Sequence, residues 1–258
     1  MKTADIDKMQ GHWILAKMGK KVLRPGGKEL TLTLIENLNI SENDAVVEFA
    51  PGLGHTSEIV LKQNPKSYTG VELDKNAIRF LQNKINQPNV QFVAGNVAET
   101  GLPSNSYDKV FGEAMLTMQD DRRKIEIIKE AHRILKKGGL YAIHELGLLP
   151  DNLPQDKKDQ IQKELSLCIK VNARPLSQTE WKKLLQNEGF LIKKISTNSM
   201  RLLEPRRIIA DEGFFNSLNI FFNILKSTKA RKRILAMRQI FKQYKNQINA
   251  VAIIAEKI

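Results

Sequence analysis

Between Asp44 and Glu145, short runs of β-branched and aromatic residues alternate with longer stretches of helical periodicity. This alternation predicts repeated strand–helix–strand units, which build a parallel sheet covered by helices on both faces. Each run is short and continuously apolar, which is typical of a strand buried inside such a sheet. The predicted strands are Ala45–Phe49, Ser67–Glu72, Val90–Ala94, Tyr107–Gly112 and Leu140–Glu145.

The segments between and before these strands predict helices, because their apolar residues recur at intervals of three and four. The pair Gly138–Gly139 is a helix stop signal, and it follows the predicted helix Asp120–Leu135. The turn Arg24-Pro25-Gly26-Gly27 separates two helices ahead of the first strand. The predicted helices are Asp5–Leu23, Lys28–Leu38, Thr56–Lys62, Lys75–Ile85 and Asp120–Leu135.

The pattern changes after the fifth strand. Ser177-Gln178-Thr179-Glu180 has the form of a capping box and predicts a helix that ends near Gly189. Two further strands are predicted at Phe190–Ser196 and Ile248–Glu256. The long helical stretch Pro205–Lys245 between them indicates a lid or docking element, since a simple hairpin needs only a few residues.

A glycine-rich turn, Ala50-Pro51-Gly52-Leu53-Gly54, follows the first predicted strand. Glycines at such a turn let the backbone approach a ligand closely. About twenty residues later Glu72 ends the second strand, where a carboxylate can accept hydrogen bonds from both hydroxyls of a ribose. A tight turn beside an unrelated surface acid is the alternative. The combination favours a site for a nucleoside-containing cofactor.

The turn departs from the dinucleotide-binding pattern, because the acid Glu48 precedes it and Ser57 occupies the position where that pattern has its third glycine. A nicotinamide-dependent reductase is therefore a lesser alternative. The motifs together resemble the class I S-adenosylmethionine-dependent methyltransferases, in the small-molecule, type 11-like branch, and the resemblance covers Gly11 to Ile258. It rests on Glu48-Phe49-Ala50-Pro51-Gly52-Leu53-Gly54, Gly70-Val71-Glu72-Leu73-Asp74, Gly95-Asn96-Val97, Ser106-Tyr107-Asp108 and Arg133-Ile134-Leu135-Lys136-Lys137-Gly138-Gly139.

The resemblance implies an α/β, Rossmann-like fold with a seven-stranded, mostly parallel sheet and helices on both faces. Residues 1–40 would form a helical cover, and residues 41–258 would form the methyltransferase domain, including a basic helical insertion at 205–246. The implied cofactor is S-adenosyl-L-methionine, and the implied acceptor is a small or lipid-like molecule. An RNA methyltransferase and a non-catalytic cofactor-binding module of the same fold are the alternatives.

Residue by residue, the resemblance places the methionine part of the cofactor at the glycine-rich turn, the ribose at Glu72 and the adenine beside Leu73. Asn96 stands where the family usually has an acid, and its amide oxygen can still accept a hydrogen bond. Ala50 stands where the family usually has a glycine, which requires a negative φ at that position. The expected cofactor contacts are Glu48, Ala50, Gly52, Gly54, Glu72, Leu73, Asn96, Val97 and Glu113.

Methyl transfer requires alignment of donor and acceptor and, for a weak nucleophile, removal of a proton. The acceptor is expected at the carboxyl ends of the fourth and fifth strands. His144 is a candidate base because its ordinary pKa is close to neutrality, with Glu113 and Glu145 beside it, although a packing role is an equal alternative for His144. Four expected substrate contacts are His12, Trp13, Met115 and Arg174. The histidines show no metal-ligand spacing, so we expect no metal.

The chain has 41 Lys and Arg against 28 Asp and Glu, a formal charge of +13. Residues 205–245 contain ten of the basic residues and two of the acids, so this insertion holds +8 of the excess. Two apolar helical stripes accompany the charges there, so we weigh contact with an anionic membrane against ordinary packing on the domain. Nucleic acid is a weaker candidate, because the aromatic residues lie on the apolar stripes. The stripes are Phe214, Leu218, Phe221, Phe222 and Leu225, and Ile234, Met237, Phe241 and Tyr244.

The cellular location is predicted from what the sequence contains. Cys168 is the single cysteine, so no internal disulfide can form, and residues 1–10 are polar. No run approaches the roughly 20 apolar residues that a membrane-spanning helix needs. We therefore expect a cytoplasmic protein, with peripheral membrane contact through the insertion as the additional option.

Overall fold

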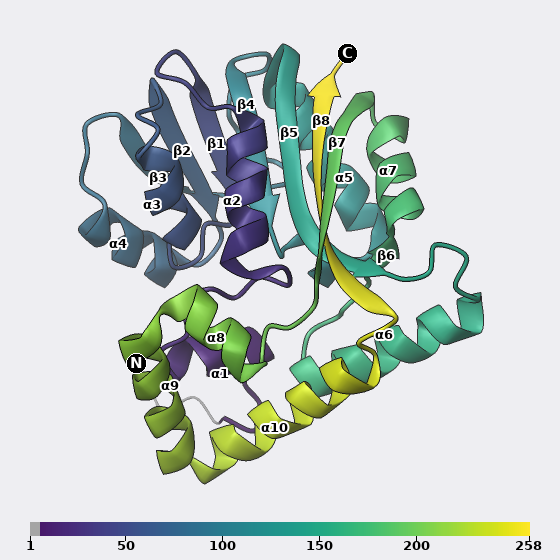
Figure 1. The fold of residues 1–258 in the computed structure, drawn as a ribbon. Coiled ribbons are helices and arrows are strands. Elements are labelled where there is room, and N and C mark those ends of the chain that lie inside the picture. The colour runs from purple at the N-terminus through teal and green to yellow at the C-terminus, as the bar shows by residue number, and fades with distance from the viewer. Residues whose placement is uncertain (1–5) are drawn as a thin grey trace.

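A computed structural model describes residues 6–258 of the chain (Figure 1). One mixed sheet forms its centre, in the strand order β3-β2-β1-β4-β5-β8-β7, with β6 paired to β5 beside this path. Strands β1 to β6 run parallel, and β8 runs antiparallel to both β5 and β7. The strands are β1 (Ala45–Phe49), β2 (Ser67–Glu72), β3 (Val90–Ala94), β4 (Tyr107–Glu113), β5 (Leu135–Leu148), β6 (Leu176–Ser177), β7 (Phe190–Ser199) and β8 (Ile248–Lys257).

The predicted α/β fold is confirmed, with the seven expected strands in the main path and the two-residue β6 as an eighth. Helices cover both faces of the sheet. α5 and α7 pack on one face, while α2, α3 and α4 pack on the other. The helices are α1 (Gly11–Lys17), α2 (Gly27–Leu38), α3 (His55–Leu61), α4 (Lys75–Lys84), α5 (Asp121–Ile134), α6 (Gln155–Ile169), α7 (Gln178–Asn187), α8 (Pro205–Glu212), α9 (Phe214–Lys226) and α10 (Thr228–Gln243), with the short 3-10 helix η1 (Leu116–Met118).

The predicted insertion is present as α8, α9 and α10, between β7 and β8. In Figure 1 these helices gather with α1 and α6 below the sheet, at the carboxyl ends of its parallel strands. A separate apolar core joins α1, α6 and α10 to the ends of β5 and β8. The insertion therefore closes one end of the domain. The predicted cover 1–40 and helix 5–23 begin within residues 1–5, which lie outside the described residues.

Three local predictions differ from the structure. α1 is shorter than the predicted helix, because Gly19 takes a φ of 100° that ends the helical path. α5 has the predicted bounds to within one residue, but β5 begins at Leu135 instead of Leu140, because the fully buried Leu135 pairs with Tyr107 in the sheet; Gly138–Gly139 therefore lie within β5. α6 was not predicted, because Ile161 and Leu165 alone among its residues are buried and its apolar periodicity is weak.

The capping box at the start of α7 forms as predicted. The Ser177 hydroxyl accepts a hydrogen bond from the Glu180 amide, and the Glu180 carboxylate accepts one from the Ser177 amide at 2.7 Å. Both amides would otherwise lack a partner at the helix end. This start directs Trp181 into the core, where its indole nitrogen donates to the Leu146 carbonyl at 3.1 Å.

Candidate functional site

One large cavity, of about 340 Å³, lies where the carboxyl ends of the parallel strands meet α1, α6 and α10. We call it the central cavity. Its polar residues come from α1 and the segment after it, from the ends of β2 and β4, from the start of α3 and from η1. Its apolar residues come from α1, α6, α10 and β5 and from the segments that follow α1, β4 and β7. The polar lining includes His12, Arg24, His55, Glu72, Glu113 and Thr117; the apolar lining includes Leu23, Met115, Leu146, Leu165, Ile169, Met200, Leu202, Met237 and Phe241.

The glycine-rich turn forms the wall of the cavity at the end of β1. Gly52 has a φ of 58°, and a Cβ added there would meet nothing within 4 Å, so its backbone is open to a ligand. Gly54 has a φ of 72° and begins α3, where a side chain would clash with Leu81. Gly52 lines the cavity, while Gly54 lies behind it and shapes the turn.

Ala50 lines the cavity but does not have the expected conformation. Its φ is 54°, so the prediction of a negative φ is wrong. The chain reverses direction directly after β1, and the Ala50 amide donates to the Val71 carbonyl at 2.8 Å. This reversal holds Ala50 in the left-handed region, at a cost of about 1–2 kcal/mol for a residue with a Cβ. The family's usual glycine avoids that strain.

Glu72 is held at the edge of the cavity by backbone amides. Its Oε1 accepts from Leu73 at 2.8 Å and from Asp74 at 3.0 Å, and its Oε2 accepts from Gly52 at 3.0 Å. These bonds fix the carboxylate against the turn. A carboxylate has about four acceptor sites, so Oε2 retains capacity for a ligand hydroxyl.

Glu48 does not reach the cavity, contrary to the prediction of a direct cofactor contact. It is buried between β1, β2 and α3, where the Ser57 hydroxyl donates to it at 2.8 Å and the Tyr68 hydroxyl donates to it as well. Burial raises the pKa of Glu48 to about 7, against the opposing effect of these hydrogen bonds. Its role is to tie the start of α3 to the sheet beneath the turn.

The predicted adenine contacts also lie outside the central cavity. Leu73 is exposed beside Glu72. The Asn96 side-chain oxygen accepts from the Ala98 amide at 3.0 Å and from the Arg123 guanidinium, so it is already used within the protein. Val97 packs against the core. The prediction that Asn96 accepts from the adenine amino group therefore conflicts with its bonding.

Glu113 lines the cavity and stands at the centre of a buried polar cluster. The Arg24 Nε lies 2.6 Å from it, the Thr31 hydroxyl donates to it at 2.6 Å, and Thr56 and His144 also contact it. Burial alone would raise the pKa of Glu113, but the Arg24 charge and these hydrogen bonds outweigh burial and lower it to about 2. Glu113 therefore stays ionised and is a poor proton acceptor.

The structure contradicts the prediction that His144 or Glu145 acts as the base. His144 is fully buried and does not line the cavity; its Nε2 accepts from the Gly26 amide at 3.1 Å, and its Nδ1 bonds Glu113 at 2.8 Å. Glu145 is also fully buried, and it accepts from the amides of Met115, Leu116 and Thr117 and from the Thr117 hydroxyl. Both residues position neighbouring segments, and neither reaches the cavity.

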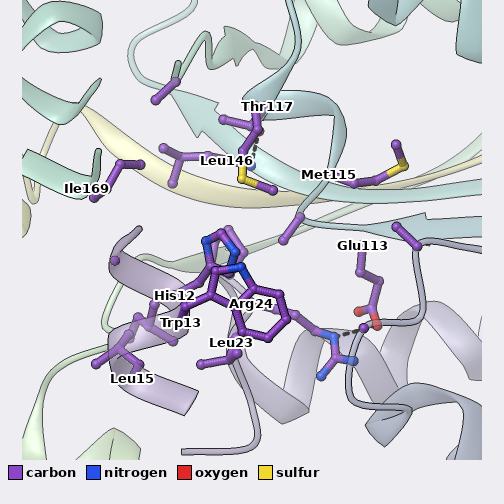
Figure 2. A pocket seen from close by; sticks show the side chains of 18 of the residues that line it. His12, Trp13, Leu15, Leu23, Arg24, Glu113, Met115, Thr117, Leu146 and Ile169 are labelled. Carbon is purple, nitrogen blue, oxygen red and sulfur yellow. Dashed lines mark hydrogen bonds and ion pairs between the residues drawn. The ribbon is translucent and has the colours of Figure 1, made fainter. Parts of the chain in front are cut away.

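Three predicted substrate contacts do come together. Figure 2 shows His12 and Trp13 of α1 pointing toward Thr117 and Leu146, with Met115 on the far side. The two rings lie 5.2 Å apart between centroids. Burial lowers the pKa of His12, so its imidazole is neutral near pH 7. Among the residues that line the cavity, His12 is therefore suited to accept a proton.

Arg174, the fourth predicted substrate contact, does not line the cavity. Its guanidinium pairs with Asp121 at 2.6 Å, and its amide donates to the Thr117 carbonyl at 2.7 Å. The neighbouring Ala173, which is fully buried, lines the cavity instead. The pair with Asp121 holds the Arg174 side chain at the start of α5.

Arg24 and His55 are cavity residues that the sequence reasoning did not assign. Two of their nitrogen atoms, Arg24 Nη1 and His55 Nε2, are buried and have no hydrogen-bond partner within residues 6–258. Buried polar atoms are nearly always paired, so both atoms fit a ligand that brings its own polar group. The available signal was position alone: Arg24 lies in the Arg-Pro-Gly-Gly turn, and His55 directly follows Gly54.

Residues 6–258 contain neither a metal site nor a membrane-spanning helix. No group of three or more His, Cys, Asp or Glu in residues 6–258 is arranged to hold a metal ion. In the same part of the chain, no helix combines the length and apolar character that crossing a bilayer requires.

Comparisons with known proteins point to one enzyme class. Residues 47–143 match the family model described as a methyltransferase domain. An uncharacterized protein of Haemophilus influenzae is 32% identical over 251 residues, covering 96% of this chain and 98% of the relative. Erythromycin 3''-O-methyltransferase of Saccharopolyspora erythraea is 26% identical over 229 residues, covering 82% of this chain and 72% of the relative.

Solved structures show the same fold. Phosphoethanolamine N-methyltransferase 2 of Haemonchus contortus, in complex with phosphomonomethylethanolamine and S-adenosylhomocysteine, superposes with a TM-score of 0.73 at 17% identity. The superposition covers 96% of this chain and 57% of that structure, so the chain spans little more than half of that enzyme.

Proposed function

Since the chain belongs to the class I S-adenosylmethionine-dependent methyltransferases, in the type 11 branch, we propose that its methyl acceptor is a small molecule with an apolar body. The observation that carries this proposal is the apolar part of the central cavity, which adjoins the glycine-rich turn and Glu72. Apolar walls with a few placed polar groups are typical of small-molecule sites. The relative whose name specifies erythromycin as acceptor supports the same class.

The cofactor is S-adenosylmethionine, and the residues of the cavity fit it. Gly52 leaves room for close approach, and Glu72 can accept from the ribose hydroxyls. The unpartnered Arg24 Nη1 can donate to the carboxylate of the methionine part, with His55 beside it. When bound, the cofactor supplies an electrophilic methyl group on a sulfonium.

The residues of the chain contribute alignment, exclusion of water and proton acceptance. Trp13, Met115 and the apolar side chains of α6 and α10 surround the space beside the turn, and they exclude water from it. Glu113 remains ionised and holds Arg24 in place. His12, neutral and directed into the cavity, accepts the proton of an acceptor hydroxyl or amine.

The role of His12 predicts a pH dependence. Protonated His12 cannot act as a base, and burial lowers its pKa below the ordinary 6.5. We therefore expect kcat/KM to stay level above pH 6.5 and to fall as the pH drops below the pKa of His12. His12→Phe is expected to lose about 100-fold in kcat/KM and this acid limb. His132→Gln, which changes a histidine outside the cavity, serves as the control. An unchanged acid limb in His12→Phe contradicts the role of His12.

The acceptor class is tested by incubating the protein with a cell extract and cofactor carrying a labelled methyl group. Label is expected in the solvent-extractable small-molecule fraction, and label confined to RNA or protein would overturn the proposal. Ile169→Trp narrows the apolar part of the cavity and is expected to reduce this labelling while S-adenosylhomocysteine still binds. Leu167→Trp, on the exposed side of the same helix, is the matched control.

A further inference from the structure

An exposed apolar surface covers one side of α9. We call it the α9 face and define it by Phe214, Phe215, Leu218, Phe222 and Leu225. Phe215 is 84% exposed and Leu225 is 64% exposed. Four of the five residues of the first predicted stripe belong to this exposed face, so the alternative of packing on the domain does not hold for them. The stripe of α10 does pack on the domain, through Met237 and Tyr244.

The inner side of α9 is polar and fixed to the N-terminal segment. The Asn216 side chain donates to the Gly19 carbonyl at 3.3 Å, and the Asn223 side chain donates to the Met18 carbonyl at 3.1 Å. The buried Ile220 adds an apolar contact on the same side. Because these contacts hold the asparagines inward, the phenylalanines are held outward. This orientation is the reverse of an ordinary surface helix, and an apolar face of this kind marks an interaction site.

The helix pair α9 and α10, which carries the α9 face, is basic. α9 and α10 together contain seven Lys and Arg and no Asp or Glu. The Lys226 ammonium lies 4.1 Å from the centre of the Phe222 ring. Within residues 6–258, the exposed Lys226, Lys232, Arg238 and Lys242 form no ion pair with an acid. The charge of this region is thus available to an anionic partner.

We propose that the α9 face docks on the surface of an anionic lipid bilayer. Aromatic and aliphatic side chains next to lysines are suited to the boundary between headgroups and acyl chains. There the burial of apolar surface and the attraction of the lysines to anionic lipids both favour binding. A second copy of the chain is a poorer partner, since it would bring the same basic residues against each other. α10, which follows α9 directly, contributes Met237 and Phe241 to the lining of the central cavity. The pair of helices therefore connects the docking surface to the proposed acceptor site.

Co-sedimentation of the protein with vesicles tests this docking without cofactor or acceptor, so its failure leaves the proposed function untouched. The protein is expected to bind vesicles that contain phosphatidylglycerol far better than vesicles of phosphatidylcholine alone. Binding is expected to weaken with salt, because the Debye length shortens. A wild-type protein that does not distinguish the two vesicles overturns the proposal.

A matched pair of variants tests the face itself. Phe222→Ser is expected to lower the partition coefficient onto anionic vesicles about tenfold, since it removes a phenylalanine that would enter the interface. Phe80→Ser changes an exposed phenylalanine on α4, which also has a lysine four residues later, with the Lys84 ammonium 5.8 Å from the ring. This control is expected to bind as the wild type does, and equal loss in both variants overturns the proposal.

A charge-reversed variant tests the role of the lysines, and a second measurement tests whether the α9 face joins two copies of the chain. Lys226→Glu combined with Lys232→Glu is expected to reduce binding to anionic vesicles and to leave the unfolding midpoint unchanged, because both side chains are exposed. Sedimentation of the wild type and Phe222→Ser without vesicles detects self-association. If Phe222→Ser converts a dimer to a monomer and the wild type ignores vesicles, the face joins two copies and the membrane proposal is wrong.

Discussion

Arg24→Met is expected to lower the free energy of unfolding by about 3–5 kcal/mol, which is the usual cost of removing one partner of a buried ion pair. The Glu113 side chain is 4% exposed and has the Arg24 Nε 2.6 Å away, so the variant leaves an uncompensated carboxylate in the interior. The loss is measured by urea unfolding at several pH values. Binding of S-adenosylhomocysteine is expected to weaken as well, because the Nη1 donor disappears.

The pH dependence of this loss follows from Glu113. In the wild type its folded pKa of about 2 lies below the ordinary 4.5, so its stabilisation is fully present above about pH 4.5 and is lost as the pH falls toward 2. Without Arg24 the pKa of Glu113 rises, and the carboxyl group becomes protonated at a higher pH. The variant is therefore expected to lose more stability at pH 8 than at pH 5.

A surface pair of the same kind provides the control for Arg24. The Arg122 Nε lies 3.0 Å from Glu126, but the Arg122 side chain is 90% exposed. Arg122→Met is expected to change the free energy of unfolding by less than about 1 kcal/mol, as exposed pairs do. Arg24→Met combined with Glu113→Gln should recover part of the loss. If Arg24→Met and Arg122→Met lower the free energy of unfolding by the same small amount, the buried cluster around Glu113 does not stabilise the protein as described here.

Glu72→Ala is expected to weaken S-adenosylhomocysteine binding at least ~100-fold. One charge-assisted hydrogen bond to the ribose contributes about 1.5–3 kcal/mol, and the variant also releases the Gly52 amide that Glu72 holds at 3.0 Å. Calorimetric titration of the wild type and the variant measures the difference. Urea unfolding of the variant separates the loss of the ribose contact from any loss of stability, because Glu72 also accepts from the amides of Leu73 and Asp74.

Glu58→Ala is the control for Glu72, because Glu58 lies in the first turn of α3, after the same glycine-rich turn, and its side chain pairs with Lys84 at 3.0 Å. It is expected to bind S-adenosylhomocysteine as the wild type does. Unchanged affinity in Glu72→Ala, in a protein that unfolds like the wild type, would refute the assignment of the ribose site.

The sheet and the cofactor turn were predictable because their signals are local. The strands β1, β2 and β3 have the predicted bounds, since a short apolar run between turn residues determines a buried strand. Glu72 and Gly52 lie together at the cavity because the carboxyl ends of neighbouring parallel strands meet at one edge.

The roles of individual side chains were less predictable, because they depend on which face of a strand each residue occupies and on what covers that face. His144 and Glu145 are adjacent on β5 and point to opposite faces of the sheet. The turn at Gly26 covers His144, and η1 covers Glu145. Neither cover can be read from the strand itself, so both residues were assigned to catalysis when they are buried positioning groups.

The sequence by itself determined the fold class, the glycine-rich turn, the acid Glu72 beside it and the presence of a basic helical insertion, since each depends on residues close together in the chain. The tertiary structure decided the apolar side of the cavity, which joins α1, α6 and α10 from distant parts of the chain. It also decided that the apolar stripe of α9 faces outward, because Asn216 and Asn223 find their partners on the N-terminal segment. Long-range packing selects one face of a helix for burial, and helical periodicity alone does not show which face that is.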